Sequence, residues 1–393
     1  MKAGSGLIRM RANKSVRQRF ADCYLPLTAA LFSFGCGAPG EPAPPAPPIP
    51  STVTDLTALQ RGDSAVLTFT LPRKSTTGDR LTDTPAIEVL RGTAREDGTP
   101  DAKSLRVVET IPGELVAKDL KEERVEVTDP ISPEDAKAHP GMRAAYEVRT
   151  RVSKKRVSAN SNVVVLRLYP VAERITTLQT RVTETSIELS WAAPEKTSGG
   201  EALTSPVAYR VYRGEIDPAS AVAATKDMAD AKWRVKPILL GLADGTSYRD
   251  SGFEFGKTYV YLIRSAVSAA DKAVESSDSV PAVVTSLDTF PPAAPTGLVV
   301  AALSGATGGS AQVDLSWSIN NETDLAGYRV YRSEQESTKG ALITPELLLT
   351  PAVRDNSVQP GHRYWYSVTA VDRAGNESAA SQQVAVEIAQ PSP

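Results

Sequence analysis

Cysteine and histidine are nearly absent from this chain, which has two of each among its 393 residues. So few thiols exclude a thiolate metal site and a disulfide framework. His139 and His362 each flank a glycine at corresponding positions of two repeated segments, so we expect turn residues and not a catalytic pair. The chain also lacks an uninterrupted apolar run of about 18 residues, the length that predicts an ordinary transmembrane helix.

Catalytic signatures and an excess of positive charge are missing too. The sequence contains no G-x-S-x-G, H-E-x-x-H or Walker-type motif. Beyond the first 35 residues, 38 basic residues stand against 45 acidic ones, a net charge near −7. A mildly acidic chain without a basic stripe is poorly suited to neutralising phosphates. We therefore predict a protein that is not an enzyme, has no catalytic residue, needs no cofactor or metal and binds no nucleic acid.

Residues 1–35 have the layout of a secretory signal peptide. Six Lys and Arg side chains precede the mostly apolar run FADCYLPLTAALFSFGC, which ends in small residues. A start at Met10 would give a leader of more usual length. Gly35-Cys36 resembles the lipobox of bacterial lipoproteins, although Ser33 stands where that family prefers Leu. The resemblance implies cleavage before Cys36 and acylation of that cysteine.

A lipid on Cys36 would give this protein a membrane anchor. Cys23 would leave with the leader, so Cys36 would be the sole cysteine of the mature chain, and two or three acyl chains anchor a protein firmly. A plain secreted protein is the alternative. Gly37 is not the Asp that retains lipoproteins at the inner membrane, which favours an outer-membrane lipoprotein. Residues 36–50 combine this cysteine with a Pro-rich linker, which predicts an extended spacer.

Three copies of one pattern follow the linker. Each copy has three segments in which apolar and polar residues alternate, the pattern of a half-buried strand. The first segments are Ser64–Pro72, Ser186–Pro194 and Ala311–Ile319; the second are Ala86–Gly92, Ala208–Gly214 and Gly327–Ser333; the third are Ala145–Val152, Thr258–Val267 and Arg363–Val371. The shared order and spacing predict three repeats of one strand arrangement.

The segments TFPPAAPTGLVV, LAGYRVYRS and VQPGHRYWYSVTAVDRAGNES resemble fibronectin type III domains of the bacterial style. That family folds as a seven-stranded antiparallel sandwich of about 100 residues. The resemblance implies an all-β chain of three tandem β-sandwiches behind the signal peptide and tether. We expect a diverged first domain at 51–169, a second at 170–289 and a third at 290–390.

The resemblance also implies a set of core residues. The aromatic of the family's second strand falls on Trp191 and Trp317, with Phe69 in its place in the first domain. The tyrosine of the family's corner between the fifth and sixth strands falls on Tyr259 and Tyr364. The first domain has Ala144 at that position, so it would lack the corner hydroxyl.

Exposed loops are where we look for binding. The loop 73–85 and the basic loop 153–161 would gather at one end of the first sandwich. Their cations could then converge on an acidic glycan or a phosphate, although a solvated loop end is the simpler interpretation. The candidate binding residues are Lys74, Arg80, Lys154, Lys155 and Arg156.

Three further features allow two interpretations each. The charged segment Lys121–Asp129 predicts a solvated edge strand better than a pair of catalytic carboxylates. The segment Asn320–Gly327 is rich in oxygen ligands and could hold Ca²⁺, but it lacks the spacing of an EF-hand loop. Trp233 is either an exposed sugar-stacking platform or, as is more common, a Trp packed over a sheet edge.

Arg61-Gly62-Asp63 followed by Ser64 matches the tetrapeptide by which integrins recognise animal fibronectin. In the repeat alignment, Gln60–Asp63 directly precedes the first strand segment, as other turns do in the second and third repeats. Gly supplies the backbone freedom of a reversal, and Asp favours turns. We therefore expect the turn between the first two strands of the first domain, hemmed in at its junction with the second domain.

These features predict a non-enzymatic, lipid-anchored protein of the bacterial cell envelope, facing the periplasm or the surface. Its modules would act as a spacer and as a protein- or glycan-binding surface. One alternative is an accessory binding subunit of an extracellular polysaccharide-degrading system, because bacterial fibronectin type III modules often accompany glycoside hydrolases. The other alternative is an adhesin that uses Arg61-Gly62-Asp63.

Overall fold

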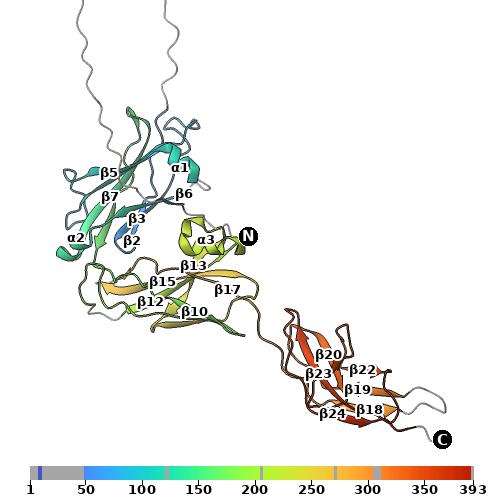
Figure 1. The fold of residues 1–393 in the computed structure, drawn as a ribbon. Helices are drawn as coiled ribbons and strands as arrows, with labels where there is room; N and C mark the ends of the chain where they lie inside the picture. Colours follow the sequence, from blue (N-terminus) through green and yellow to red (C-terminus); the bar gives the residue numbers. More distant parts are fainter. Residues whose placement is uncertain are drawn as a thin grey trace, which may run out of the picture. The chain divides into compact units, whose positions relative to one another are not determined.

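The computed structural model describes residues 8–10, 48–119, 124–203, 207–269, 272–303 and 311–390. Cys23, Cys36 and most of the predicted signal peptide and linker lie outside these residues. The described chain is built almost entirely of strands, which form six sheets in which nearly all neighbours are antiparallel (Figure 1). The all-β prediction is confirmed, and the sheets form β-sandwiches of the fibronectin type III and immunoglobulin-like class.

The first sandwich has a four-stranded and a five-stranded sheet. The first sheet has the order β1-β6-β3-β2, from β1 (Ile8–Met10), β6 (Arg124–Pro130), β3 (Ser64–Thr70) and β2 (Thr57–Gln60). The second has the order β5-β4-β7-β8 with β9 also on β7, from β5 (Arg106–Ile111), β4 (Ala86–Thr93), β7 (Met142–Ser153), β8 (Arg156–Val157) and β9 (Val164–Leu168). Two short helices, α1 (Gly113–Asp119) and α2 (Pro133–Ala138), join strands.

Alternation in the sequence explains the core of the first sandwich. Leu67 and Phe69 of β3 point inward, and Phe69 pairs with Val125 of β6. They share one buried cluster with Ile87 of β4 and Tyr146 of β7, so both sheets contribute to one core. The helical turn α2 begins where a Ser precedes a Pro in the sequence, and the Ser132 hydroxyl accepts a hydrogen bond from a backbone N–H of its first turn.

The sequence predicts a solvated edge strand at 121–129, but its described part, from residue 124 on, is paired on both sides. Residues 124–130 form β6, which lies between β3 and the short parallel strand β1. Its Val125 and Val127 are fully buried, as their alternation predicts, and Glu126 is also buried. Because β1 lies within the predicted leader, cleavage before Cys36 would remove it and leave β6 at the edge of the sheet, as the sequence predicts.

The second sandwich again has two sheets. One has the order β10-β11-β14, from β10 (Gln179–Val182), β11 (Ile187–Ser190) and β14 (Ser247–Asp250). The other has the order β13-β12-β15-β16 with β17 also on β15, from β13 (Trp233–Ala243), β12 (Val207–Ile216), β15 (Thr258–Ala269), β16 (Lys272–Glu275) and β17 (Ala282–Thr285). Between β12 and β13 the chain forms η1 (Pro218–Ser220), α3 (Ala221–Lys226) and η2 (Met228–Asp230).

The third sandwich is the shortest. Its sheets have the orders β18-β19-β22 and β21-β20-β23-β24. The strands are β18 (Val299–Leu303), β19 (Gln312–Ser316), β20 (Leu325–Ser333), β21 (Ala341–Leu342), β22 (Ala352–Asp355), β23 (Arg363–Asp372) and β24 (Val384–Glu387). Between β20 and β21 it has a loop where the second sandwich has its helical insert.

The repeat alignment reappears in the packing of aromatic rings. Trp191 meets Tyr209 edge to face with ring centroids 5.2 Å apart, and Trp317 meets Tyr328 in the same way at the same distance. The five expected core residues are all buried: Phe69, Trp191, Trp317, Tyr259 and Tyr364. The Tyr364 hydroxyl accepts a hydrogen bond from the Gln359 backbone N–H at 3.2 Å, which is the bond expected of a corner tyrosine.

Candidate functional site

The predicted basic residues lie in two loops of the first sandwich. Lys74 and Arg80 face each other across a small hairpin, and both are exposed. Lys154 and Lys155 are exposed in the turn between β7 and β8, and Arg156 begins β8. The structure thus brings residues together within each loop. Convergence of the two loops on one anion stays a prediction.

The turn at Arg61-Gly62-Asp63 contacts the second sandwich, as the sequence predicts. It connects β2 to β3, and Gly62 has a φ of +56°. The Gly62 N–H donates to the Glu275 carbonyl at 2.8 Å. A Cβ on Gly62 would lie 2.8 Å from the Ser277 backbone nitrogen, so only Gly fits against this segment.

The carboxylate of this turn is engaged as well. Asp63 accepts a hydrogen bond from the Ser198 hydroxyl at 2.6 Å, and its side chain is partly buried. Burial raises the pKa of Asp63 above its usual value, although the hydrogen bond from Ser198 acts in the opposite direction. Lys137 pairs with Glu201 at 3.4 Å beside it. The residues Arg61-Gly62-Asp63, which match an integrin ligand, are therefore part of the contact between the first two sandwiches.

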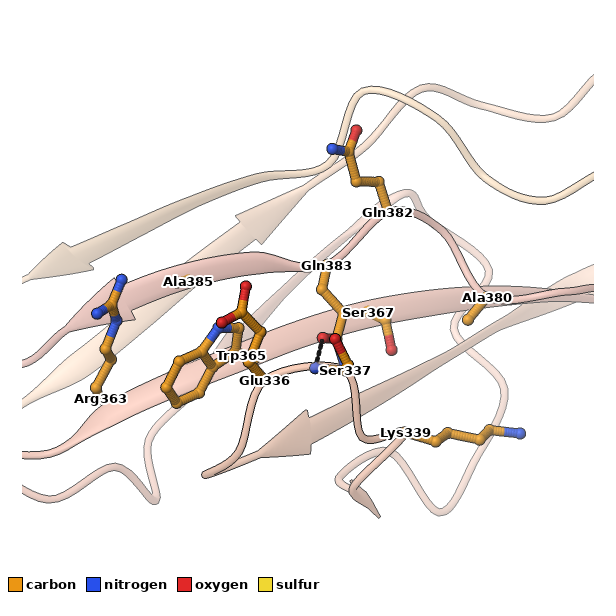
Figure 2. A pocket seen from close by; sticks show the side chains of 10 residues that line it. All are labelled: Glu336, Ser337, Lys339, Arg363, Trp365, Ser367, Ala380, Gln382, Gln383 and Ala385. Carbon is orange, nitrogen blue, oxygen red and sulfur yellow. Dashed lines mark hydrogen bonds between the residues drawn. The ribbon is translucent and has the colours of Figure 1, made fainter.

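A groove lies on the outer face of the third sandwich (Figure 2). It is lined by the loop around 336–339, by alternate residues 363, 365 and 367 of β23, and by residues 380–385 before and within β24. Trp365 stands on this face because its neighbours Tyr364 and Tyr366 point into the core. The Arg363 guanidinium carbon is 5.1 Å from the centroid of the Trp365 ring.

The indole of Trp365 is half-buried, and the exposed Arg363 side chain lies over one of its faces. The partners of Trp365 in register are Ser333 on β20 and Ala385 on β24, both small. Ser367, the next outward residue on β23, is 1% exposed, and its hydroxyl has no hydrogen-bond partner among the described residues. The groove thus has an aromatic surface, and an unsatisfied hydroxyl lies buried beneath it.

The loop at 334–340 forms one wall of the groove and is held by Gln383, the residue before β24. Gln383 accepts a hydrogen bond from the Ser337 N–H at 2.8 Å and donates to the Thr338 carbonyl at 2.7 Å. Figure 2 shows the first of these bonds as a dashed line. Ser337 has a φ of +60°, a conformation that residues other than Gly seldom adopt. This clamp of two hydrogen bonds therefore holds a strained backbone in place.

Glu377 anchors the end of this wall. Its carboxylate accepts four side-chain hydrogen bonds of 2.6–3.0 Å, from Arg329, Tyr331, Lys339 and Thr369. Burial alone would raise the pKa of Glu377, but these four bonds outweigh it and lower the pKa to about 2. The ammonium of Lys339 also lies 4.2 Å from the Tyr331 ring centroid. Lys339 is thereby fixed at the groove by a carboxylate that stays ionised.

In the other two repeats, the position that corresponds to Trp365 is buried. The residue that aligns with Trp365 is Val260 in the second sandwich and Ala145 in the first, and both are fully buried. Val260 packs in a cluster with Ala224 of α3, so the helical insert covers it. Among the described residues, only the third repeat has a partly exposed aromatic side chain at this position. The alternation around Tyr364 and Tyr366 was the sequence signal that could have singled out Trp365.

Trp233, the platform weighed from sequence, is packed instead. It belongs to the same cluster as Val260, and it lies against Gly214, where an added Cβ would approach the indole within 2.5 Å. The structure therefore supports the packed interpretation of Trp233.

Three carboxylates gather near the oxygen-rich segment 320–327. Ligand oxygens of Asp288, Asp324 and Asp372 lie within 4.8 Å of one another. Asp372 already accepts hydrogen bonds from the Asn376 backbone N–H and side-chain amide, both at 2.8 Å. The group has the chemistry of a cation site, but internal hydrogen bonds account for part of it, and we assign no metal there.

Curated proteins that resemble this chain are polysaccharide-degrading enzymes by name. Exoglucanase B from Cellulomonas fimi is 28% identical over 215 residues, which is 52% of this chain and 16% of that enzyme. The amylopullulanases of Thermoanaerobacterium saccharolyticum and Thermoanaerobacter thermohydrosulfuricus are each 40% identical, over 76 and 81 residues. Those matches cover 19% and 20% of this chain but 6% and 5% of the enzymes. The chain thus spans less than a fifth of the length of each relative.

Other comparisons add less. No family model matches the chain. A solved structure of the chicken CNTN1 FN1–FN3 domains covers 87% of this chain and 100% of its own length, with 15% identity and a TM-score of 0.25. None of the helices in the described part of the chain has the length and apolar character that crossing a membrane requires.

Proposed function

We propose that this chain is a non-catalytic, lipid-anchored protein of the bacterial cell envelope whose fibronectin type III sandwiches present a glycan-binding surface. The observation that carries the proposal is the partial match to an exoglucanase and to amylopullulanases. A match to a small part of several large enzymes is what a shared accessory module produces. Over the described residues, the outer face of the third sandwich offers a groove for such a ligand.

The non-catalytic part of the proposal rests on the residues themselves. The two histidines lie in different sandwiches, and no motif for a nucleophile or a metal protease is present. The same observations fit an accessory role beside a separate hydrolase. The chain would then bind the polysaccharide while the hydrolase cleaves it. The Pro-rich segment after Cys36 would lift the sandwiches away from the membrane.

Binding to insoluble polysaccharides tests the proposed function. The purified chain is incubated with cellulose, with starch granules and with chitin, and the bound fraction is measured after washing. We expect retention on at least one glucan and no release of reducing sugar during incubation. Binding to none of the three polymers, or release of sugar by the chain alone, contradicts the proposal.

Metabolic labelling with an alkyne fatty acid tests the anchor. We expect the wild-type chain to carry the label and the Cys36→Ala chain to lack it, because acylation requires that thiol. Cys23→Ala is the matched control and should retain the label. Label on the Cys36→Ala chain would exclude the proposed lipid site while leaving glycan binding to be judged separately.

A further inference from the structure

We propose that the groove around Trp365 binds an uncharged polysaccharide, with one pyranose ring stacked on the indole. This inference rests on the proposed function and gives it a site and a class of ligand. The sequence did not single out this position, which became visible only when distant segments came together.

Stacking is the first part of the inference. A pyranose ring presents axial C–H bonds on its faces, and these form an apolar surface that matches the flat face of an indole. Trp365 stands on the outward side of the central strand β23, between the small partners Ser333 and Ala385. A broad, shallow surface of this kind accommodates one unit of a long chain without requiring the end of that chain.

Polar groups around the indole supply the second part. Sugar hydroxyls both donate and accept, so a sugar site needs both kinds of partner close to its aromatic surface. Gln382 offers an amide and Glu336 a carboxylate at the rim, and both are exposed. The Ser367 hydroxyl is buried beneath the groove, so Gln382 and Glu336 are the polar groups that a sugar could reach at its surface.

The charges at the groove favour an uncharged ligand. Lys339 is committed to Glu377 at 3.0 Å, and Arg363 lies over the indole and 4.0 Å from Glu387. Glu336 adds a negative charge to the same rim. Positive and negative side chains are therefore both present at the groove and partly paired with each other, whereas binding of an acidic glycan would require a cluster of free cations.

The other repeats show why the site belongs to the third sandwich. In the second, the helical insert covers the aligned Val260, and in the first the aligned Ala145 offers no aromatic surface. The chain therefore has a single platform of this kind in its described part. One platform predicts weak binding to short oligosaccharides and stronger retention on polymers when many copies sit on one membrane.

Affinity electrophoresis of the full chain tests this site. Native gels contain either hydroxyethyl cellulose or pullulan, so the two arms distinguish a β-linked from an α-linked glucan. We expect retardation in one of them for the wild type, and at least about tenfold weaker apparent affinity for Trp365→Ala. Ala385→Glu, which fills the groove from an exposed position, should weaken binding to the same extent while leaving the core untouched.

The matched control is Ile319→Ala, which removes an exposed apolar side chain from the same sandwich outside the groove. It should migrate like the wild type. If the wild type binds and both groove variants bind equally well, the Trp365 site is wrong although the proposed function stands. If the wild type binds neither polymer nor the insoluble glucans, both proposals fall.

Discussion

Glu377 shows how one carboxylate can organise the surface beside the groove. Three donors from two strands and a fourth from a loop converge on it, and its side chain is 22% exposed. Each hydrogen bond to an ionised acceptor is stronger than one between neutral groups. The groove wall therefore depends on a residue that does not line the groove itself.

The stability that Glu377 provides should depend on pH. Its pKa is about 2 in the folded protein against a usual 4.5, so its contribution is complete above pH 4.5 and is lost as the pH falls towards 2. The shift corresponds to a contribution on the order of 3 kcal/mol at neutral pH. We expect Glu377→Gln to destabilise the chain in urea unfolding at pH 7 and to differ much less from the wild type near pH 2.5.

Glu387→Gln is the control for this experiment, since Glu387 is a more exposed carboxylate on the same sheet. It should change the free energy of unfolding little at either pH, as is usual for exposed ion pairs. A Glu377→Gln chain whose destabilisation is the same at both pH values would contradict the assigned role of Glu377.

Two buried tyrosines at corresponding positions make the same hydrogen bond. The repeat alignment predicted their inward direction but not their partners. Tyr146 and Tyr366 point inward as expected, and each hydroxyl donates to an aspartate at 2.9 Å, Asp129 in one sandwich and Asp355 in the other. Burial raises the pKa of both tyrosines, and the neighbouring carboxylate adds to the effect. The aspartates come from other strands, so their pairing could not be inferred from the alternation within β7 and β23.

At the scale of elements, one insertion decides which face is open. The second sandwich places α3 between β12 and β13, and this helix buries Val260. The third sandwich replaces it with the loop 334–340, which forms the wall of a groove. A difference in loop content between repeats therefore changes a closed face into an accessible one.

The clamp on that loop gives a second prediction. Gln383→Ala removes both hydrogen bonds to the loop backbone, so the strained Ser337 should relax. We expect amide hydrogen exchange at residues 337–339 to accelerate by tenfold or more, about 1.4 kcal/mol in local opening. Gln382→Ala changes a neighbouring exposed side chain and should leave exchange in the loop unchanged. Unaltered exchange in the Gln383→Ala chain would show that the clamp does not hold the loop.

At the scale of the whole molecule, the Arg61-Gly62-Asp63 turn joins the first two sandwiches. Its backbone bonds to Glu275 and its carboxylate bonds to Ser198. The turn therefore contributes to stiffness of the chain and does not project freely into solvent. A stiff pair of modules after a Pro-rich segment would suit the lipid-anchored protein that we propose.

Two glycines with the same backbone constraint can test this joint. Gly62 and Gly78 both have positive φ, but a Cβ on Gly62 would meet Ser277 whereas one on Gly78 would meet nothing within 4 Å. Gly78→Ala should cost about 1 kcal/mol from backbone strain alone. Gly62→Ala should cost about 1–3 kcal/mol more and speed tryptic cleavage after Arg174 between the sandwiches. Equal behaviour of the two variants would contradict an interdomain role for the turn.

The sequence by itself determined the strands, the inward aromatics and the turn at Gly62, because each depends on local alternation or on backbone freedom at one residue. It also supports the lipobox resemblance at Cys36, which lies outside the described residues. Only the tertiary structure decided where a ligand can bind. The groove is formed by residues near 336, 365 and 382, and it is open because no helical insert covers it. Both its composition and its openness depend on how segments far apart in the sequence pack together. No pattern within one segment can predict them.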